Sequence, residues 1–107
     1  MALIRVNGGT SSTVTEITPS GYNPSDPKSY SGLEVGATYA ISFGKVSDAT
    51  SQDLALTGAT ILYQNRNSSG GSAGANFGIA IIRATAATVT STGTNAMALG
   101  SKIYKIG

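Results

Sequence analysis

Eleven consecutive residues, from Leu33 to Phe43, alternate between apolar side chains and small or polar ones. The apolar series consists of Leu33, Val35, Ala37, Tyr39, Ile41 and Phe43. The residues between them are Glu34, Gly36, Thr38, Ala40 and Ser42. Successive side chains of a strand point to opposite faces, whereas the same residues would be spread around a helix. The stretch therefore predicts a β-strand with one buried face, and other strands must cover that face.

A second strong alternation follows the Gly-rich segment that ends at Gly74. Ala75, Phe77, Ile79 and Ile81 alternate there with Asn76, Gly78, Ala80 and Ile82. The first series predicts the apolar face of a strand, and Ile82 indicates that the other face is partly covered as well. By the same criterion we expect the main strands at residues 33–43, 59–64, 75–83, 87–91 and 102–106.

Turn residues separate these segments, and the only helical structure that we expect is a single turn over residues 96–99. Parallel strands need a crossover helix, so the pairing must be antiparallel. About seven short strands with turns between them are typical of a sandwich or a barrel. The predicted fold class is all-β, a small antiparallel β-sandwich or barrel with an extended N-terminal segment that contains Pro and Gly.

Residues 1–32 differ in character from residues 33–107, which we expect to form the β-sandwich or barrel domain. An apolar run over residues 2–6 and an alternating run over 11–17 flank Asn7-Gly8, a strong turn signal, so they predict a hairpin or an extended arm. Residues 19–32 hold all three prolines, which exclude a helix or a central strand. This part is either a plain linker or an arm that docks on a neighbouring subunit. The candidate docking residues are Tyr22, Pro24, Pro27 and Tyr30.

The composition favours a protein that packs against other proteins. Charged residues make up 11% of the chain, against roughly 25% in ordinary soluble domains. A surface of Ser, Thr, Asn and Gly is easily desolvated, which is typical of chains that assemble. A domain of 107 residues has limited apolar area to bury, and we expect it to complete its core in an oligomer.

Few kinds of chemistry are open to this sequence. It contains no His and no Cys, which argues against disulfides, zinc sites and iron–sulfur clusters. Residues 70–74 match G-x-S-x-G, but that nucleophile motif requires a His base. The seven Lys and Arg residues are scattered singly, unlike the basic stripes that bind nucleic acid. We expect no enzymatic activity, no cofactor, no metal, no nucleic-acid partner and no membrane span. The N-terminus lacks the apolar core of a signal peptide, so we expect synthesis in the cytoplasm.

Three segments, residues 33–39, 81–90 and 104–106, resemble parts of small phage and prophage virion proteins. The proteins in question are head fibres, decoration proteins and tail-fibre modules, and the resemblance covers mainly residues 33–107. The resemblance does not assign a functional role to any residue of this chain. It implies a non-enzymatic, self-associating β-domain located in the virion, with copies of itself and other virion proteins as partners.

The main hypothesis is therefore a virion structural or accessory protein that acts through protein–protein assembly. The alternative is a carbohydrate-binding or cell-surface-binding module of a fibre or adhesin, which would recognise host glycans through loops such as residues 65–74. A small enzyme is disfavoured because no acid–base pair is found.

Overall fold

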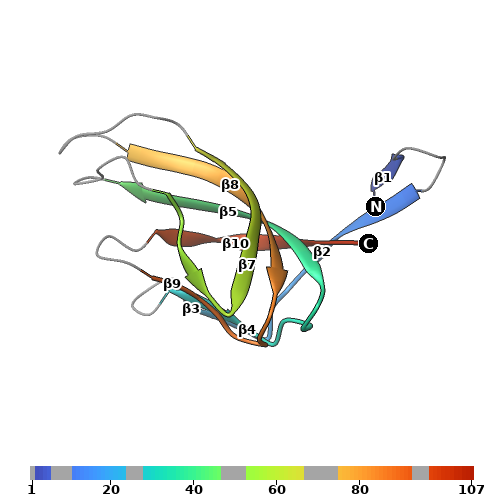
Figure 1. Ribbon diagram of the computed structural model, residues 1–107, viewed down its shortest axis with the longest axis horizontal. Coiled ribbons are helices and arrows are strands. Elements are labelled where there is room, and N and C mark those ends of the chain that lie inside the picture. The colour runs from blue at the N-terminus through green and yellow to red at the C-terminus, as the bar shows by residue number, and fades with distance from the viewer. Residues whose placement is uncertain (1, 6–10, 24–27, 47–52, 67–74, 93–96) are drawn as a thin grey trace.

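The computed structural model describes residues 2–5, 11–23, 28–46, 53–66, 75–92 and 97–107. This part of the chain forms ten strands and no helix. A six-stranded antiparallel sheet has the order β1-β2-β10-β5-β8-β7, and a four-stranded antiparallel sheet has the order β3-β4-β9-β6 (Figure 1). The strands of the first sheet are β1 (Ala2–Arg5), β2 (Ser11–Ile17), β10 (Ala98–Ile106), β5 (Thr38–Val46), β8 (Ala75–Ala84) and β7 (Ala59–Arg66). Those of the second are β3 (Gly21–Asn23), β4 (Ser29–Ser31), β9 (Val89–Ser91) and β6 (Leu56–Thr57). The predicted all-β, antiparallel fold is confirmed, in the form of a small sandwich.

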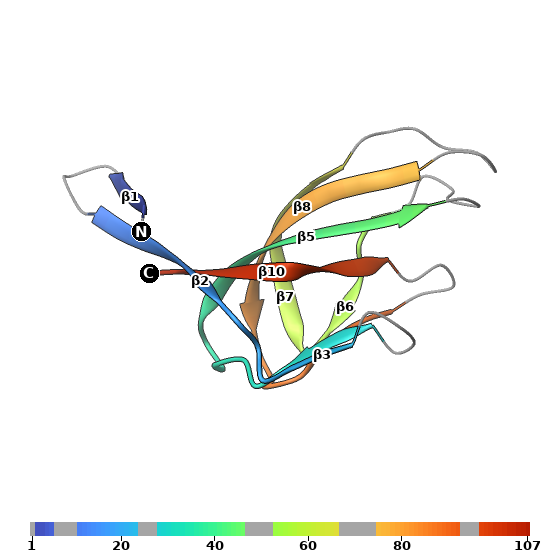
Figure 2. The same cartoon turned by 180° about the vertical axis from the view of Figure 1, so that it is seen from behind.

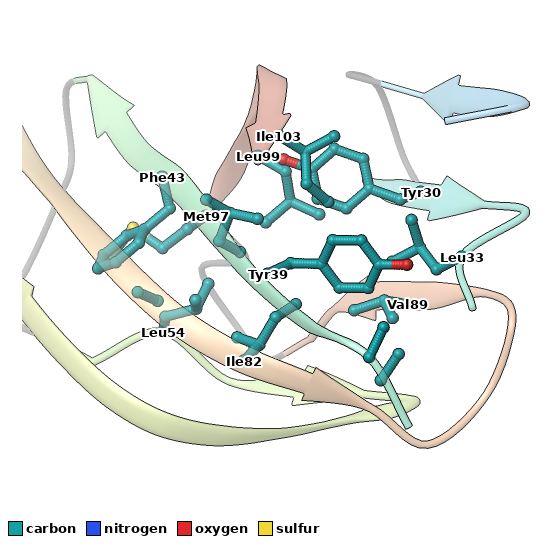
Figure 3. Packing of buried hydrophobic residues seen from close by; sticks show 14 residues of the cluster. Tyr30, Leu33, Tyr39, Phe43, Leu54, Ile82, Val89, Met97, Leu99 and Ile103 are labelled. Atoms are coloured by element: carbon teal, nitrogen blue, oxygen red, sulfur yellow. The ribbon is translucent and has the colours of Figure 1, made fainter. Parts of the chain in front are cut away.

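The core fills the space between the two sheets (Figure 3). Tyr39, Ile41 and Phe43 point inward from β5, at most 3% exposed, which confirms the buried face predicted for this segment. The largest fully buried side chains are Tyr30, Tyr39, Ile82, Met97, Leu99, Ile103 and Val89. Both sheets therefore contribute to one core.

The alternating stretch from Leu33 to Phe43 is not one strand throughout. Gly36 has a φ of 91° and lies in a turn closed by a hydrogen bond from Ala37 N to Glu34 O of 3.1 Å. Val35 is 62% exposed, although its place in the series predicts burial. A glycine adopts positive φ at no steric cost, so the chain turns here and β5 begins only at Thr38.

The predicted helical turn over residues 96–99 is also wrong for the described residues 97–99. Ala98 and Leu99 begin strand β10 and pair with Gly44 and Phe43 of β5. Met97 and Leu99 are buried and Ala98 is exposed, the period of two that a strand requires.

The N-terminal third is part of the sandwich. β2 pairs with β10 from Ile17↔Ile103 to Val14↔Ile106, and β4 pairs with β9 in the other sheet. The expectations of a linker and of no central strand over residues 19–32 are therefore wrong, because this segment contains β3 and β4, and β4 lies between β3 and β9 in the small sheet. The predicted hairpin of β1 and β2 is present, and it projects away from the rest of the molecule (Figure 2).

Candidate interaction surface

The outer face of the six-stranded sheet carries large apolar side chains on its strands β7 and β8. The register places Tyr63 opposite Ile81, Ile81 opposite Ala40, and Ala40 opposite Tyr104. A register shift between Ile61 and Tyr63 leaves both Leu62 and Tyr63 exposed, as expected for a β-bulge. We define the outer apolar face as Leu62, Tyr63, Phe77, Ile79 and Ile81.

Four large side chains of the outer apolar face are about half exposed. The exposed fractions are 45% for Leu62, 53% for Tyr63, 54% for Phe77 and 56% for Ile79. Since side chains of this size bury about 150–250 Å² each when fully covered, the four leave about 400 Å² of apolar area in water. Monomeric proteins rarely expose contiguous apolar patches larger than a few hundred Å², and such patches often mark interaction sites.

The orientation of β8 is the opposite of the one predicted. Gly78, Ala80 and Ile82 face the core, and Phe77 and Ile79 face outward. A Cβ on Gly78 would lie 2.3 Å from Asn65 O and 2.7 Å from Phe43 Cζ. The space inside β8 is therefore already occupied at this end of the strand, so the small residues lie inside and the large ones remain outside.

A hollow of about 510 Å³ lies beside Phe77. The register aligns Phe77 with Gly44, and Gly44 with Ala98, so two of the three residues in this row have little or no side chain. Gly100 also lines the hollow, and a Cβ there would lie only 1.9 Å from Ser42 Oγ. The hollow thus exists because small residues from β5 and β10 meet next to a large one from β8.

Two lysines give the hollow a positive charge. Lys28, which precedes β4, and Lys45 of β5 both line it, and both are half-buried. The ion pairs between described residues use other cations: Arg66 Nε lies 3.1 Å from Asp53 Oδ1, and Lys105 Nζ lies 3.2 Å from Glu34 Oε2. Asp26 and Asp48 lie outside the described residues.

The structure describes two of the four predicted docking residues, Tyr22 and Tyr30. Tyr30 is fully buried in the chain's own core, so its prediction as an anchor for a neighbouring subunit is wrong. Tyr22 is 37% exposed and stacks on Tyr30, with ring centroids 5.8 Å apart. Pro24 and Pro27 lie outside the described residues.

The two tyrosines fasten the small sheet to β10. β2 pairs with β10 only over Ile103–Ile106, so the carbonyls of Leu99 and Gly100 lie beyond that pairing. Tyr22 Oη donates a hydrogen bond of 2.6 Å to Leu99 O, and Tyr30 Oη donates one to Gly100 O. Burial, and to a lesser extent the neighbouring Tyr22, raises the pKa of the Tyr30 phenol well above its usual range.

Sequence reasoning did not find the outer apolar face or the hollow. Neither has a contiguous signature, because each combines residues from strands that are distant in the chain. The one available signal was that both faces of residues 75–82 are apolar, which requires a cover on both sides.

Comparison with protein-family models, curated proteins and solved structures finds no match for this chain. Within the described residues, no helix is long and apolar enough to cross a membrane. The described Asp and Glu side chains form no group of three or more that could hold a metal ion.

Proposed function

We propose that this chain is a non-enzymatic structural or accessory protein of a virion, and that it assembles with copies of itself and with other virion proteins. The observation that supports assembly is the outer apolar face, with four large side chains about half exposed on two adjacent strands. The resemblance of residues 33–39, 81–90 and 104–106 to phage virion proteins supports the particle as the location.

The size of the face indicates how such an assembly is held together. Covering about 400 Å² of apolar surface contributes on the order of 10 kcal/mol. The loss of translational and rotational freedom costs about 4–15 kcal/mol per association. One such contact is therefore weak, and stable incorporation requires several contacts per copy, as in a shell or a fibre.

Sedimentation velocity over a series of protein concentrations tests the proposal. We expect the wild type to form larger species as the concentration rises, and Ile79→Lys to remain monomeric. Thr57→Lys, on the exposed side of β6 in the other sheet, is the matched control and should behave as the wild type. A wild type that stays monomeric at every concentration, or equal behaviour of the Ile79 variant, would contradict assembly through this face.

The carbohydrate-binding alternative has one observation in its favour, namely that the rings of Tyr63 and Phe77 are exposed on one face. If these rings stack on sugars, Tyr63→Ala should abolish binding to a glycan array while the wild type binds. An array without signal for the wild type argues against this alternative.

A further inference from the structure

We propose that two copies of this chain pack face to face through the outer apolar face, related by a two-fold axis that runs along the strands between β5 and β8. This inference rests on the proposed function, because it gives the geometry of the self-assembly contact. In a two-fold contact each copy presents the same surface, so that surface must be complementary to itself. The outward side of the six-stranded sheet meets this condition.

Large and small outward side chains lie on neighbouring strands of this sheet. We define the ridge as the outward residues of β8, which are Phe77, Ile79 and Ile81. The register places a small residue of β5 beside each of them, in the order Gly44, Ser42 and Ala40. Since neighbouring strands are about 4.8 Å apart, the surface directly beside the ridge has no large side chain.

β10 widens this low surface on the side away from the ridge. Ala98 pairs with Gly44 and is exposed, and a Cβ on Gly100 would lie 1.9 Å from Ser42 Oγ. Both residues therefore face the same side of the sheet as Ser42. We define the low strip as Ala40, Ser42, Gly44, Ala98 and Gly100. It offers room for large side chains of a second copy.

The position of the ridge beside the low strip selects the two-fold axis. Sheets that pack with their strands aligned can be related by an axis along the strands or by one across them. The axis along the strands exchanges β5 with β8 at constant height, so Ile79 of one copy meets Ser42 of the other, and Phe77 meets Gly44. The axis across the strands places β8 on β8 and leaves both low strips uncovered. Stacked sheets lie about 10 Å apart and interdigitate their side chains, which the first axis allows and the second does not.

The area and the charge of the face fit a second copy. Its four large side chains leave about 400 Å² of apolar area on each copy, hence about 800 Å² in the pair, and the covered low strips add to this area. The total approaches the area of about 1,200–2,000 Å² that stable specific interfaces bury. Neither the ridge nor the low strip contains a charged residue, so the contact removes no charge from water. At one end of the contact, Tyr63 of one copy meets Tyr104 of the other, which is an aromatic pair.

Pairing through the free edge of β7 is less favourable. The register shift between Ile61 and Tyr63 interrupts that strand, and a bulge at an edge hinders the addition of a further strand. A second copy therefore fits the face of the sheet and not its edge.

Substitution of Ser42 distinguishes the two axes by sedimentation equilibrium of the full chain. Ser42→Phe adds apolar surface, but it occupies the position that Ile79 of the second copy needs. We therefore expect self-association to weaken at least about tenfold. With the axis across the strands the new ring would lie over an uncovered strip, and association would stay equal or become stronger. That result overturns the proposal.

Complementary charges test the same contact without adding bulk to the low strip on both copies. Ile79→Asp and Ser42→Lys each bring a charge into an apolar contact, so each alone should weaken association at least about tenfold. An equimolar mixture of the two should recover most of the lost affinity, because the carboxylate of one copy meets the ammonium group of the other. Ile79→Asp mixed with Thr57→Lys, which places its lysine on the other sheet, is the matched control and should recover nothing. Equal recovery in the two mixtures, or recovery in neither, overturns the two-fold geometry.

The outcomes separate this inference from the proposed function. If the wild type assembles and Ser42→Phe associates as well as the wild type, self-assembly stands and the axis along the strands is wrong. If the wild type is monomeric at every concentration, both proposals are wrong.

Discussion

Replacing Tyr30 by Phe removes a single hydroxyl group from the point where the small sheet is fastened to β10. The ring stays in place, fully buried and stacked on Tyr22. The hydrogen bond to Gly100 O is lost, and that carbonyl lies beyond the end of the pairing between β2 and β10. Leaving a partly buried acceptor unsatisfied costs about 1–3 kcal/mol. For a domain of about 100 residues this lowers Tm by about 5–15 °C.

The same variant should change how stability depends on pH. The pKa of Tyr30 is raised in the folded state, by burial first and by Tyr22 second, above the unfolded value of 10.0. The stabilisation by the protonated phenol is therefore fully present below pH 10 and is lost as pH rises from 10 towards the folded pKa. Over that window the free energy of unfolding falls by about 1.4 kcal/mol per pH unit from this group alone. Tyr30→Phe lacks this titration, so its deficit relative to the wild type should shrink as pH rises.

Urea unfolding followed by circular dichroism at several pH values between 8 and 11 measures both effects. Tyr22→Phe is the matched control: its hydroxyl donates to the neighbouring carbonyl of Leu99, but the side chain is 37% exposed, so we expect a smaller loss. Equal unfolding midpoints of wild type and Tyr30→Phe at pH 8, or a difference that stays constant to pH 11, would refute the reasoning.

Three further substitutions test other parts of the fold by thermal unfolding. Gly78→Ala should destabilise the protein by about 3 kcal/mol or more, because the added Cβ meets backbone atoms and the ring of Phe43. Gly36→Ala should cost only about 1 kcal/mol for its positive φ, because the added Cβ meets nothing within 4 Å. Equal losses of stability in the two variants would contradict this. Gln64→Met should cost about 1–3 kcal/mol, since the amide of Gln64 accepts from Leu54 N at 2.8 Å and donates to Leu54 O at 3.2 Å; an unchanged Tm would show that these bonds contribute nothing. Ser91→Ala should raise Tm slightly, because the buried Ser91 Oγ has no hydrogen-bond partner among the described residues; a lower Tm would indicate a partner.

Several local features of the fold could be predicted from the sequence because they depend on neighbouring residues. The all-β class follows from a period of two and from the frequent turn residues. The inward direction of Tyr39, Ile41 and Phe43 follows from the same period, since a strand with one polar face has only one way to bury the other. The turn at Gly36 was missed because the alternation continues through it, and the positive φ of a glycine leaves no mark in an apolar pattern.

The interaction surface was decided by tertiary structure. β8 has apolar residues on both faces, so its sequence alone allows either orientation, and the ring of Phe43 over Gly78 selects the one that exposes Phe77 and Ile79. The Pro-rich segment around Tyr30 predicts that this side chain is an anchor at the surface. Tyr30 is instead buried, because β4 pairs with β9 in the second sheet. The hollow depends on small residues of β5 and β10 lying in register beside β8. Periodicity is a property of adjacent residues and can be read along the chain, whereas packing and register join residues far apart in it and are determined only when the sheets come together.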